Sequence, residues 1–348
     1  MSGQDYLYIN AIRKKKIERT PIWIMRQAGR YLPEYQAVRD KYDFITVCKT
    51  PELATEVTLQ PIRRFGFDAA ILFSDILVIP EALGQKLEFM ENHGPKLSPQ
   101  ILNEKDVNRL SIEGLEEKLS YVADAVRLIR SGLDNRTPLI GFSGSPFTLA
   151  TYMIEGKPTR NFKHIKTMMY KEPQRLIRLL QLLTEAVSRY LLMQINAGAQ
   201  AIQIFDTWGG ILPPHLYNQY SGRFMKQIVE RLKISSVPIT LFSKGGIELL
   251  WQLKDSNADM LGVDWMTDLA DARQTVGGFA ALQGNLDPTV LYGSKEIIKK
   301  EVENILQVFG RQSGHVFNLG HGILPDIPVD NVQFLVDTVR EMSTKIHS

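Results

Sequence analysis

Cysteine is almost absent from this sequence of 348 residues, in which Cys48 is the single thiol. One thiol cannot form a disulfide within the chain, and it cannot supply a Cys-rich zinc or iron–sulfur site. The sequence also lacks any run near the ~18 consecutive apolar residues of a membrane span, and its first residues, MSGQDYLYIN, contain no apolar signal core. We therefore expect a soluble protein of the reducing cytoplasm, without a membrane partner.

Excess charge of one sign is missing as well. Lys and Arg number 41 against 38 Asp and Glu, which gives a formal net charge of +3. This balance does not favour nucleic acid or a membrane surface as the partner. The densest basic run, Arg13–Lys16, is interpreted as a solvated helix end. An acidic ligand would therefore require positive charge that is concentrated at one site.

One pattern is present along almost the whole chain: a short apolar run ends in a polar residue or glycine, and an amphipathic segment follows. Near-continuous apolar runs of this length are typical of strands that are buried on both faces of a parallel sheet. Alternation of such strands with helices predicts α/β architecture, and eight units predict one (β/α)8 TIM barrel over residues 1–348. The eight runs are Pro21–Arg26, Phe67–Asp75, Pro138–Gly144, Ala201–Thr207, Pro238–Lys244, Met260–Trp265, Ala280–Asn285 and His315–Gly320.

The segments between these runs have helical spacing. One helix is predicted to begin at Pro173 and to stop at Gly198, and a last helix is predicted from Asp326 to Ile346 with Pro328 in its first turn. The polar stretch Gly84–Asp106 is interpreted as a surface excursion. A further helical face follows a four-and-three spacing through Leu115, Leu119, Val122, Val126 and Ile129.

The predicted strands are apolar inside and polar where they end. In barrels of this type the active site lies at the carboxyl ends of the strands, so we expect the chemistry there. These ends carry Arg26, Ser74, Asp75, Ser143, Asp206, Thr207, Ser243, Lys244, Asp264, Asn285 and Asn318, and His321 follows the last strand.

Two arginines lie four residues apart at the first strand end. Arg26 and Arg30 flank Gly29, which permits a tight turn or a close approach of the backbone to a ligand. A guanidinium keeps its charge and binds carboxylates or phosphates in a bidentate manner, so the pair predicts an anionic ligand. The alternative is a surface ion pair with Glu34 or Asp40.

Asp75 ends a strongly apolar strand, where an unpaired carboxylate is costly to bury. It is either the partner of an arginine or an ionised acceptor for N–H donors of a ligand that stabilises a developing cation. The segment Ser143–Ser145 is a candidate anion cradle, although it does not match the G-x-S-x-G pattern and no Ser/His/Asp triad spacing supports it. Tyr152 has a packing role or a ligand role.

His321 lies between two glycines, and we expect it to contact a ligand or to relay a proton. None of the six histidines is spaced from another like a metal-binding pair, so no metal site is predicted. Lys244 is a candidate for a Schiff base of the barrel-aldolase kind, but the glycines that follow it equally indicate a structural turn.

Several of these segments together resemble the uroporphyrinogen decarboxylase family, over nearly the whole chain from about Tyr8 to about Val339. PIWIMRQAGRYLPEY, Pro21–Tyr35, is similar to the amino-terminal signature of that family, and GFSGSPFTLATYMIEG, Gly141–Gly156, is similar to a second signature. The segments FSDIL, FDTWGG and NLGHGI match others in the expected order.

The resemblance implies a TIM-barrel homodimer without metal, cofactor or prosthetic group. It implies the removal of four acetate carboxyls from uroporphyrinogen III to give coproporphyrinogen III in haem biosynthesis, with Asp75 and Arg26 as catalytic residues. Thr207 stands where many relatives have serine, and both side chains offer a hydroxyl. The implied substrate-binding residues are Arg26, Gln27, Ala28, Gly29, Arg30, Asp75, Tyr152, Thr207 and His321.

Three other functions remain open at this point. A cobamide- or thiol-dependent methyltransferase shares this barrel and would require zinc ligands near the strand ends. A non-catalytic tetrapyrrole carrier would need the arginines but not Asp75. An aldolase would use Lys244. The loop Glu155–Phe162 is interpreted as a candidate mobile lid over the site.

Overall fold

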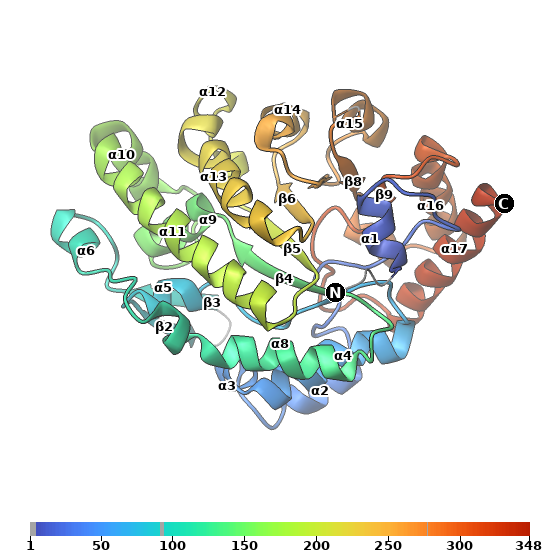
Figure 1. The fold of residues 1–348 in the computed structure, drawn as a ribbon, viewed down its shortest axis with the longest axis horizontal. Coiled ribbons are helices and arrows are strands. Elements are labelled where there is room, and N and C mark those ends of the chain that lie inside the picture. Colours follow the sequence, from blue (N-terminus) through green and yellow to red (C-terminus); the bar gives the residue numbers. More distant parts are fainter. Residues whose placement is uncertain (1–4, 91–93, 277) are drawn as a thin grey trace.

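The computed structural model describes residues 5–90, 94–276 and 278–348. Its main sheet is a curled layer of parallel strands in the order β1-β4-β5-β6-β7-β8-β9, so each strand pairs with the strand of this sheet that follows it in the sequence (Figure 1). The strands are β1 (Ala70–Ile71), β4 (Leu139–Gly144), β5 (Ala201–Asp206), β6 (Ile239–Ser243), β7 (Met260–Gly262), β8 (Ala281–Gln283) and β9 (His315–Val316).

The first predicted strand forms only a single bridge. Ile22 pairs in parallel with Phe317, and the Phe317 N–H donates to the carbonyl of Pro21 at 2.8 Å. On the other side, the N–H of Asp68 donates to the carbonyl of Ile22 at 2.9 Å. This segment therefore connects the β9 edge with the chain that enters β1, which is the position of the eighth strand in a TIM barrel.

Helices cover the outside of the curled sheet (Figure 1). They are α1 (Leu7–Ile12), α2 (Pro33–Arg39), α3 (Phe44–Lys49), α4 (Pro51–Phe65), α5 (Val78–Ala82), α6 (Glu104–Asn108), α7 (Leu115–Lys118), α8 (Ser120–Gly132), α9 (Pro146–Glu155), α10 (Lys163–Lys171), α11 (Pro173–Ala197), α12 (Pro214–Tyr217), α13 (Arg223–Leu232), α14 (Ile247–Leu253), α15 (Leu269–Val276), α16 (Lys295–Phe309) and α17 (Val329–His347).

The strands are shorter than the apolar runs that predicted them. Every residue of β4 and β6 is buried, as expected for strands covered on both faces, whereas the polar ends of most runs leave the sheet as loops. The predicted stop at Gly198 is confirmed, because this glycine has a φ of +124° after α11. The last helix was predicted three residues too early, since Pro328 precedes α17 as its N-cap.

The stretch Gly84–Asp106 contains structure that the sequence did not predict. An antiparallel hairpin forms between β2 (Lys86–Met90) and β3 (Gly94–Ser98), and α6 follows it. Asn103 and Asp106 form a capping box at the start of α6. The hairpin is separate from the main sheet, and it contributes Phe89 and Pro95 to the wall of the main cavity.

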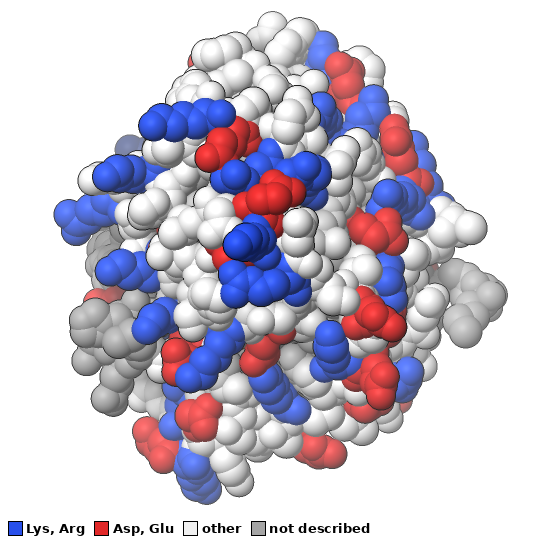
Figure 2. All heavy atoms as spheres, turned by 90° about the vertical axis from the view of Figure 1, so that its left-hand side faces the viewer, with Lys and Arg blue, Asp and Glu red and all other residues white. Residues whose placement is uncertain are grey.

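Basic and acidic side chains are intermixed over the face on the left of Figure 1, the side of α6 and α10 (Figure 2). Ion pairs also join α11 to two neighbouring helices, because Arg178 pairs with Glu104 of α6 and Arg189 pairs with Glu116 of α7. None of the described helices combines the length and the apolar character that crossing a membrane requires.

Candidate active site

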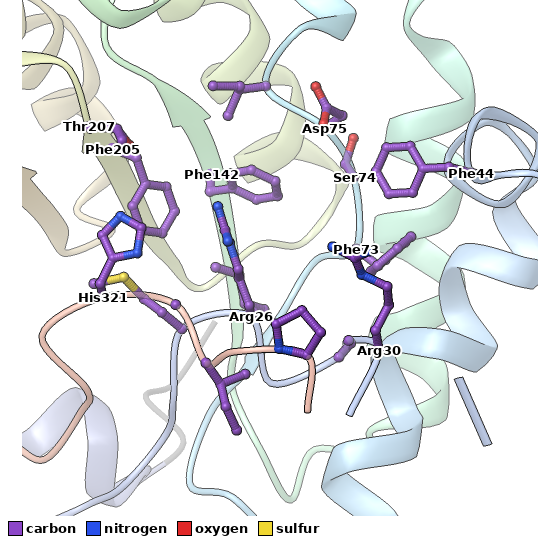
Figure 3. A pocket seen from close by; sticks show the side chains of 18 of the residues that line it. Arg26, Arg30, Phe44, Phe73, Ser74, Asp75, Phe142, Phe205, Thr207 and His321 are labelled. Atoms are coloured by element: carbon purple, nitrogen blue, oxygen red, sulfur yellow. The ribbon is translucent and has the colours of Figure 1, made fainter. Parts of the chain in front are cut away.

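A cavity of about 500 Å³ opens at the carboxyl ends of the strands. Figure 3 shows Arg26 projecting into it, with His321 on one side and Arg30 on the other. Residues far apart in the sequence meet here because parallel strands all end at the same edge of the sheet. Eight of the nine predicted binding residues line the cavity: Arg26, Ala28, Gly29, Arg30, Asp75, Tyr152, Thr207 and His321.

Both arginines are exposed to the cavity, and neither has a carboxylate partner among the described residues. The alternative of a surface pair with Glu34 is wrong, because Glu34 binds Arg64 through contacts of 2.6 and 2.9 Å. Two unpaired guanidinium groups on one wall give the cavity a local positive charge, although the net charge of the whole chain is small.

The backbone around Arg26 is shaped to aim its side chain. Arg26 has a φ of +62°, a left-handed conformation that is uncommon outside glycine. The stem of the side chain lies against Gly322, where a Cβ would lie 2.4 Å from Cδ and 2.8 Å from Cγ of Arg26. A side chain at position 322 would occupy the space of the Arg26 stem, which explains the glycine that follows His321.

Gln27 is the predicted residue whose side chain the structure places elsewhere. It is 1% exposed, and its Nε2 donates to the carbonyl of Ala69 at 3.1 Å. Its own carbonyl accepts the hydroxyl of Tyr31 at 2.8 Å. Gln27 therefore joins the arginine segment to the chain before β1, and a direct role in binding remains a prediction.

Asp75 lies on the cavity wall after β1, where its Oδ1 accepts the N–H of Leu77 at 2.7 Å. Burial raises the pKa of Asp75 from 3.8 to about 6, while the Leu77 N–H and the charge of Arg26 oppose this rise. The carboxylate forms no direct ion pair with an arginine in the described structure, so it is available to a ligand.

His321 is held between two aromatic rings. Its ring lies edge-on to Phe242 at 6.2 Å and to Trp265 at 5.9 Å between centroids. Burial, aided by the positive charges of Arg26 and Lys244, lowers the pKa of His321 to about 4. The imidazole is therefore neutral at neutral pH, and it offers one donor and one acceptor rather than a cation.

Tyr152 and Thr207 complete the wall from α9 and from the residue after β5. The Tyr152 ring packs against Trp208 at 6.0 Å. The predicted anion cradle is not part of this wall, because Ser143 is fully buried and Ser145 caps α9 by accepting the N–H of Thr148 at 3.0 Å.

Six phenylalanines on the cavity wall were missed by the sequence reasoning. Phenylalanine is also a common core residue, so a single sequence does not distinguish a phenylalanine of the cavity wall from one that packs in the core. Three of them succeed one another on adjacent strands, with centroid distances of 5.9 and 6.1 Å. The lining phenylalanines are Phe44, Phe73, Phe89, Phe142, Phe205 and Phe242. Figure 3 labels Phe44, Phe73, Phe142 and Phe205.

Among the remaining polar strand ends, Ser74 also lines the cavity, whereas Asp264 and Lys244 do not. Asp264 accepts the N–H of Gly245 at 2.8 Å and the hydroxyl of Thr267 at 2.8 Å, which fixes two loops beside the site. Lys244 lies over the Trp265 ring at 4.9 Å and outside the cavity lining. An aldolase role for Lys244 is therefore unsupported. Cys48 is also buried outside the lining, in α3.

The comparisons with known proteins identify the family of the chain. The family model described as Uroporphyrinogen decarboxylase (URO-D) matches residues 4–342. The chain belongs to the uroporphyrinogen decarboxylase family. A uroporphyrinogen decarboxylase from Legionella pneumophila (strain Lens) is 51% identical over 344 residues, covering 98% of each chain. Another from Chlorobium limicola is 50% identical over 346 residues and covers 98% of this chain and 99% of the relative.

Solved structures support the barrel architecture of this family member. A methyltransferase from Methanosarcina mazei superposes with a TM-score of 0.80 at 21% identity, covering 96% of this chain and 97% of that one. A B12-independent methionine synthase from Shewanella has a TM-score of 0.57 at 13% identity, covering 85% and 87%. At such identities the likeness concerns the fold alone, and it does not extend the methyltransferase interpretation to this chain.

Proposed function

We propose that this carboxy-lyase of porphyrin biosynthesis removes the four acetate carboxyls of uroporphyrinogen III and leaves methyl groups, giving coproporphyrinogen III. The observation that carries the proposal is one cavity with two unpaired guanidinium groups and an unpaired carboxylate on its walls. The substrate has eight carboxylates on its rim and four pyrrole N–H groups at its centre. Its binding site therefore needs cationic groups for the rim and a carboxylate for the centre.

Arg26 and Arg30 bind carboxylates of the substrate, since a guanidinium pairs with them in a bidentate manner. Tyr152, Thr207 and neutral His321 contribute hydrogen bonds around the rim, and Ala28 and Gly29 provide backbone without bulk. The phenylalanine wall contacts the apolar faces of the pyrroles.

We infer that all of residues 1–348 form one domain that works as a homodimer in the cytoplasm.

Asp75 accepts the pyrrole N–H groups, which converge on one point in a domed macrocycle. Protonation of a ring carbon next to the acetate-bearing carbon forms a pyrrole cation. The C–C bond to the carboxylate then breaks, CO2 leaves, and the electron pair neutralises the cation. A second proton converts the exocyclic methylene to a methyl group, and loss of the ring proton restores the pyrrole. A fixed negative charge stabilises both cations more than the neutral ground state.

The proton source in this scheme is water, relayed by His321 or Tyr152. The guanidinium of Arg26 is a poor acid, and it orients the acetate instead. His321, with its pKa lowered to about 4, is a neutral imidazole at neutral pH, so it carries one N–H and one acceptor nitrogen and has no additional acidic proton to supply. It therefore passes on a proton that it receives.

Turnover of uroporphyrinogen III by the wild type, Asp75→Asn and Asp75→Glu tests the proposal. We expect Asp75→Asn to lower kcat by about a hundredfold or more, because the neutral amide cannot stabilise a cation. Asp75→Glu keeps the charge and is expected to be less impaired. Near-wild-type turnover by Asp75→Asn would contradict the cation role, and binding without turnover by the wild type would indicate a carrier.

A further inference from the structure

Asp206 lies at the end of β5, directly before Thr207, and no part of the proposed chemistry uses it. It is 0% exposed and therefore cannot touch a substrate. Its two carboxylate oxygens accept hydrogen bonds from four buried hydroxyl groups, which belong to Ser145, Thr148, Tyr217 and Ser221. A buried carboxylate of this kind is costly unless its donors hold it, so its place in the fold requires an explanation.

The two oxygens serve different parts of the molecule. Oδ1 accepts from Ser145 at 2.5 Å and from Thr148 at 3.2 Å, which are the N-cap and a first-turn residue of α9. Oδ2 accepts from Tyr217 at 3.0 Å, in α12, and from Ser221 at 2.8 Å, in the π-helix Asn218–Gly222. The lining of the active-site cavity includes Tyr152 of α9 but none of α12 or of the π-helix.

Thr148 connects the contacts of Oδ1 to the residues beside the cavity wall. Its hydroxyl donates to Asp206 and also accepts the N–H of Trp208 at 3.2 Å. Thr207 is thus held between two residues that are both tied to α9. Tyr152 lies four residues after Thr148, on the same face of the helix, and its ring packs on Trp208 at 6.0 Å.

We propose that Asp206, acting through Thr148, is a positioning residue that sets the distance between two cavity-wall groups, the Thr207 hydroxyl and the Tyr152 ring. The Oδ2 side contributes stability without setting that distance. This inference rests on the proposed function, because it assigns Thr207 and Tyr152 to the binding of the tetrapyrrole.

Matched single-hydroxyl deletions separate positioning from stability. Thr148→Val removes one donor to Oδ1, and Ser221→Ala removes one donor to Oδ2 of the same carboxylate. Both side chains are 0% exposed, and Thr148→Val also removes the acceptor of the Trp208 N–H, so both variants are expected to lower the unfolding midpoint, Thr148→Val by the larger amount. Activity is measured as kcat and KM for uroporphyrinogen III, by formation of coproporphyrinogen.

We expect Thr148→Val to lower kcat/KM by about tenfold or more, since small misplacements of binding groups are costly, and Ser221→Ala to stay within about twofold of wild type. Thr148→Ser, which keeps the hydroxyl, should restore most of the loss. The double variant Thr148→Val/Thr207→Val should lose less than the product of the two single losses, because both changes affect one group.

Equal kinetic losses in Thr148→Val and Ser221→Ala would overturn the inference, as would wild-type kcat/KM in Thr148→Val or multiplicative losses in the double variant. If Thr148→Val does not fold, Thr148→Ala replaces it, because it removes the same hydroxyl and both of its hydrogen bonds. Turnover by the wild type is measured first. Its absence would contradict the proposed function itself, whereas its presence leaves only the positioning role at stake.

Discussion

The protonation state of Asp75 should control the pH dependence of kcat/KM for uroporphyrinogen III. Burial raises the pKa of this carboxyl to about 6. The ionised form is the one that accepts pyrrole N–H groups. Activity should therefore be lost as the pH falls through about 6, and the profile of kcat/KM reports this group because it reflects the free enzyme.

The size of the effect follows from a pKa of about 6. At about pH 5 roughly nine-tenths of the Asp75 population is protonated, so kcat/KM should lie about tenfold below its plateau. At about pH 7 roughly nine-tenths is ionised, and the profile should be nearly flat above that. The carboxylates of the substrate titrate at lower pH, which leaves this interval to the enzyme.

Two charge-removing variants give the assay its control. The charge of Arg26 lowers the pKa of Asp75, so Arg26→Gln should move the inflection of the profile to higher pH. Arg30 is not among the groups that shift this pKa, so Arg30→Gln should lower activity without moving the inflection. Initial rates at subsaturating substrate, measured from about pH 5 to about pH 8, provide both profiles.

A flat wild-type profile over this interval would refute the reasoning, because it would show that ionised Asp75 is not required. An inflection that moves equally in Arg26→Gln and Arg30→Gln would refute the assigned electrostatic coupling. A shift of the inflection to lower pH in Arg26→Gln would also contradict the predicted effect of the Arg26 charge on the pKa of Asp75.

Three more outcomes are expected. The pKa of buried His315 is lowered to about 4, so the unfolding free energy should fall by up to about 3 kcal/mol as the pH drops from about 6.5 to about 4, and denaturant titrations of wild type and His315→Gln should differ in this slope. Gly322→Ala should lower kcat/KM about tenfold by displacing the stem of Arg26, whereas Gly278→Ala, with open space around its Cβ, should match wild type in the same assay. Arg30→Ala should raise KM about tenfold or more with a smaller change in kcat, and an unchanged KM would contradict its role in anion binding.

Much of the candidate site was predictable because strand ends in a parallel barrel share one edge. Arg26, Asp75, Thr207 and His321 end or follow different predicted strands, and the structure brings all four to one cavity. The sequence indicated these residues because each is a polar residue at or just after the end of an apolar run. The roles assigned to them remain proposals, which the kinetic experiments test.

Other parts of the site carried no such signal. The phenylalanines of the cavity wall have the same type as core residues, and Phe89 comes from a hairpin that the polar stretch Gly84–Asp106 did not indicate. Gln27 shares the signature segment with Arg26, but its side chain is buried and donates to the carbonyl of Ala69. One sequence does not reveal such a difference between neighbouring residues.

By itself the sequence determined the alternation of buried strands and outer helices, the polar edge at which the strands end, and the family signatures. These follow from local periodicity and from residue type, which a sequence displays directly. Only the tertiary structure decided which polar groups face the cavity and which form hydrogen bonds in the protein interior. Asp75 and Asp206 both end apolar runs, yet one faces the cavity and the other accepts four hydroxyl groups. That difference depends on partners 11 to 61 residues away in the chain, and only folding brings them together.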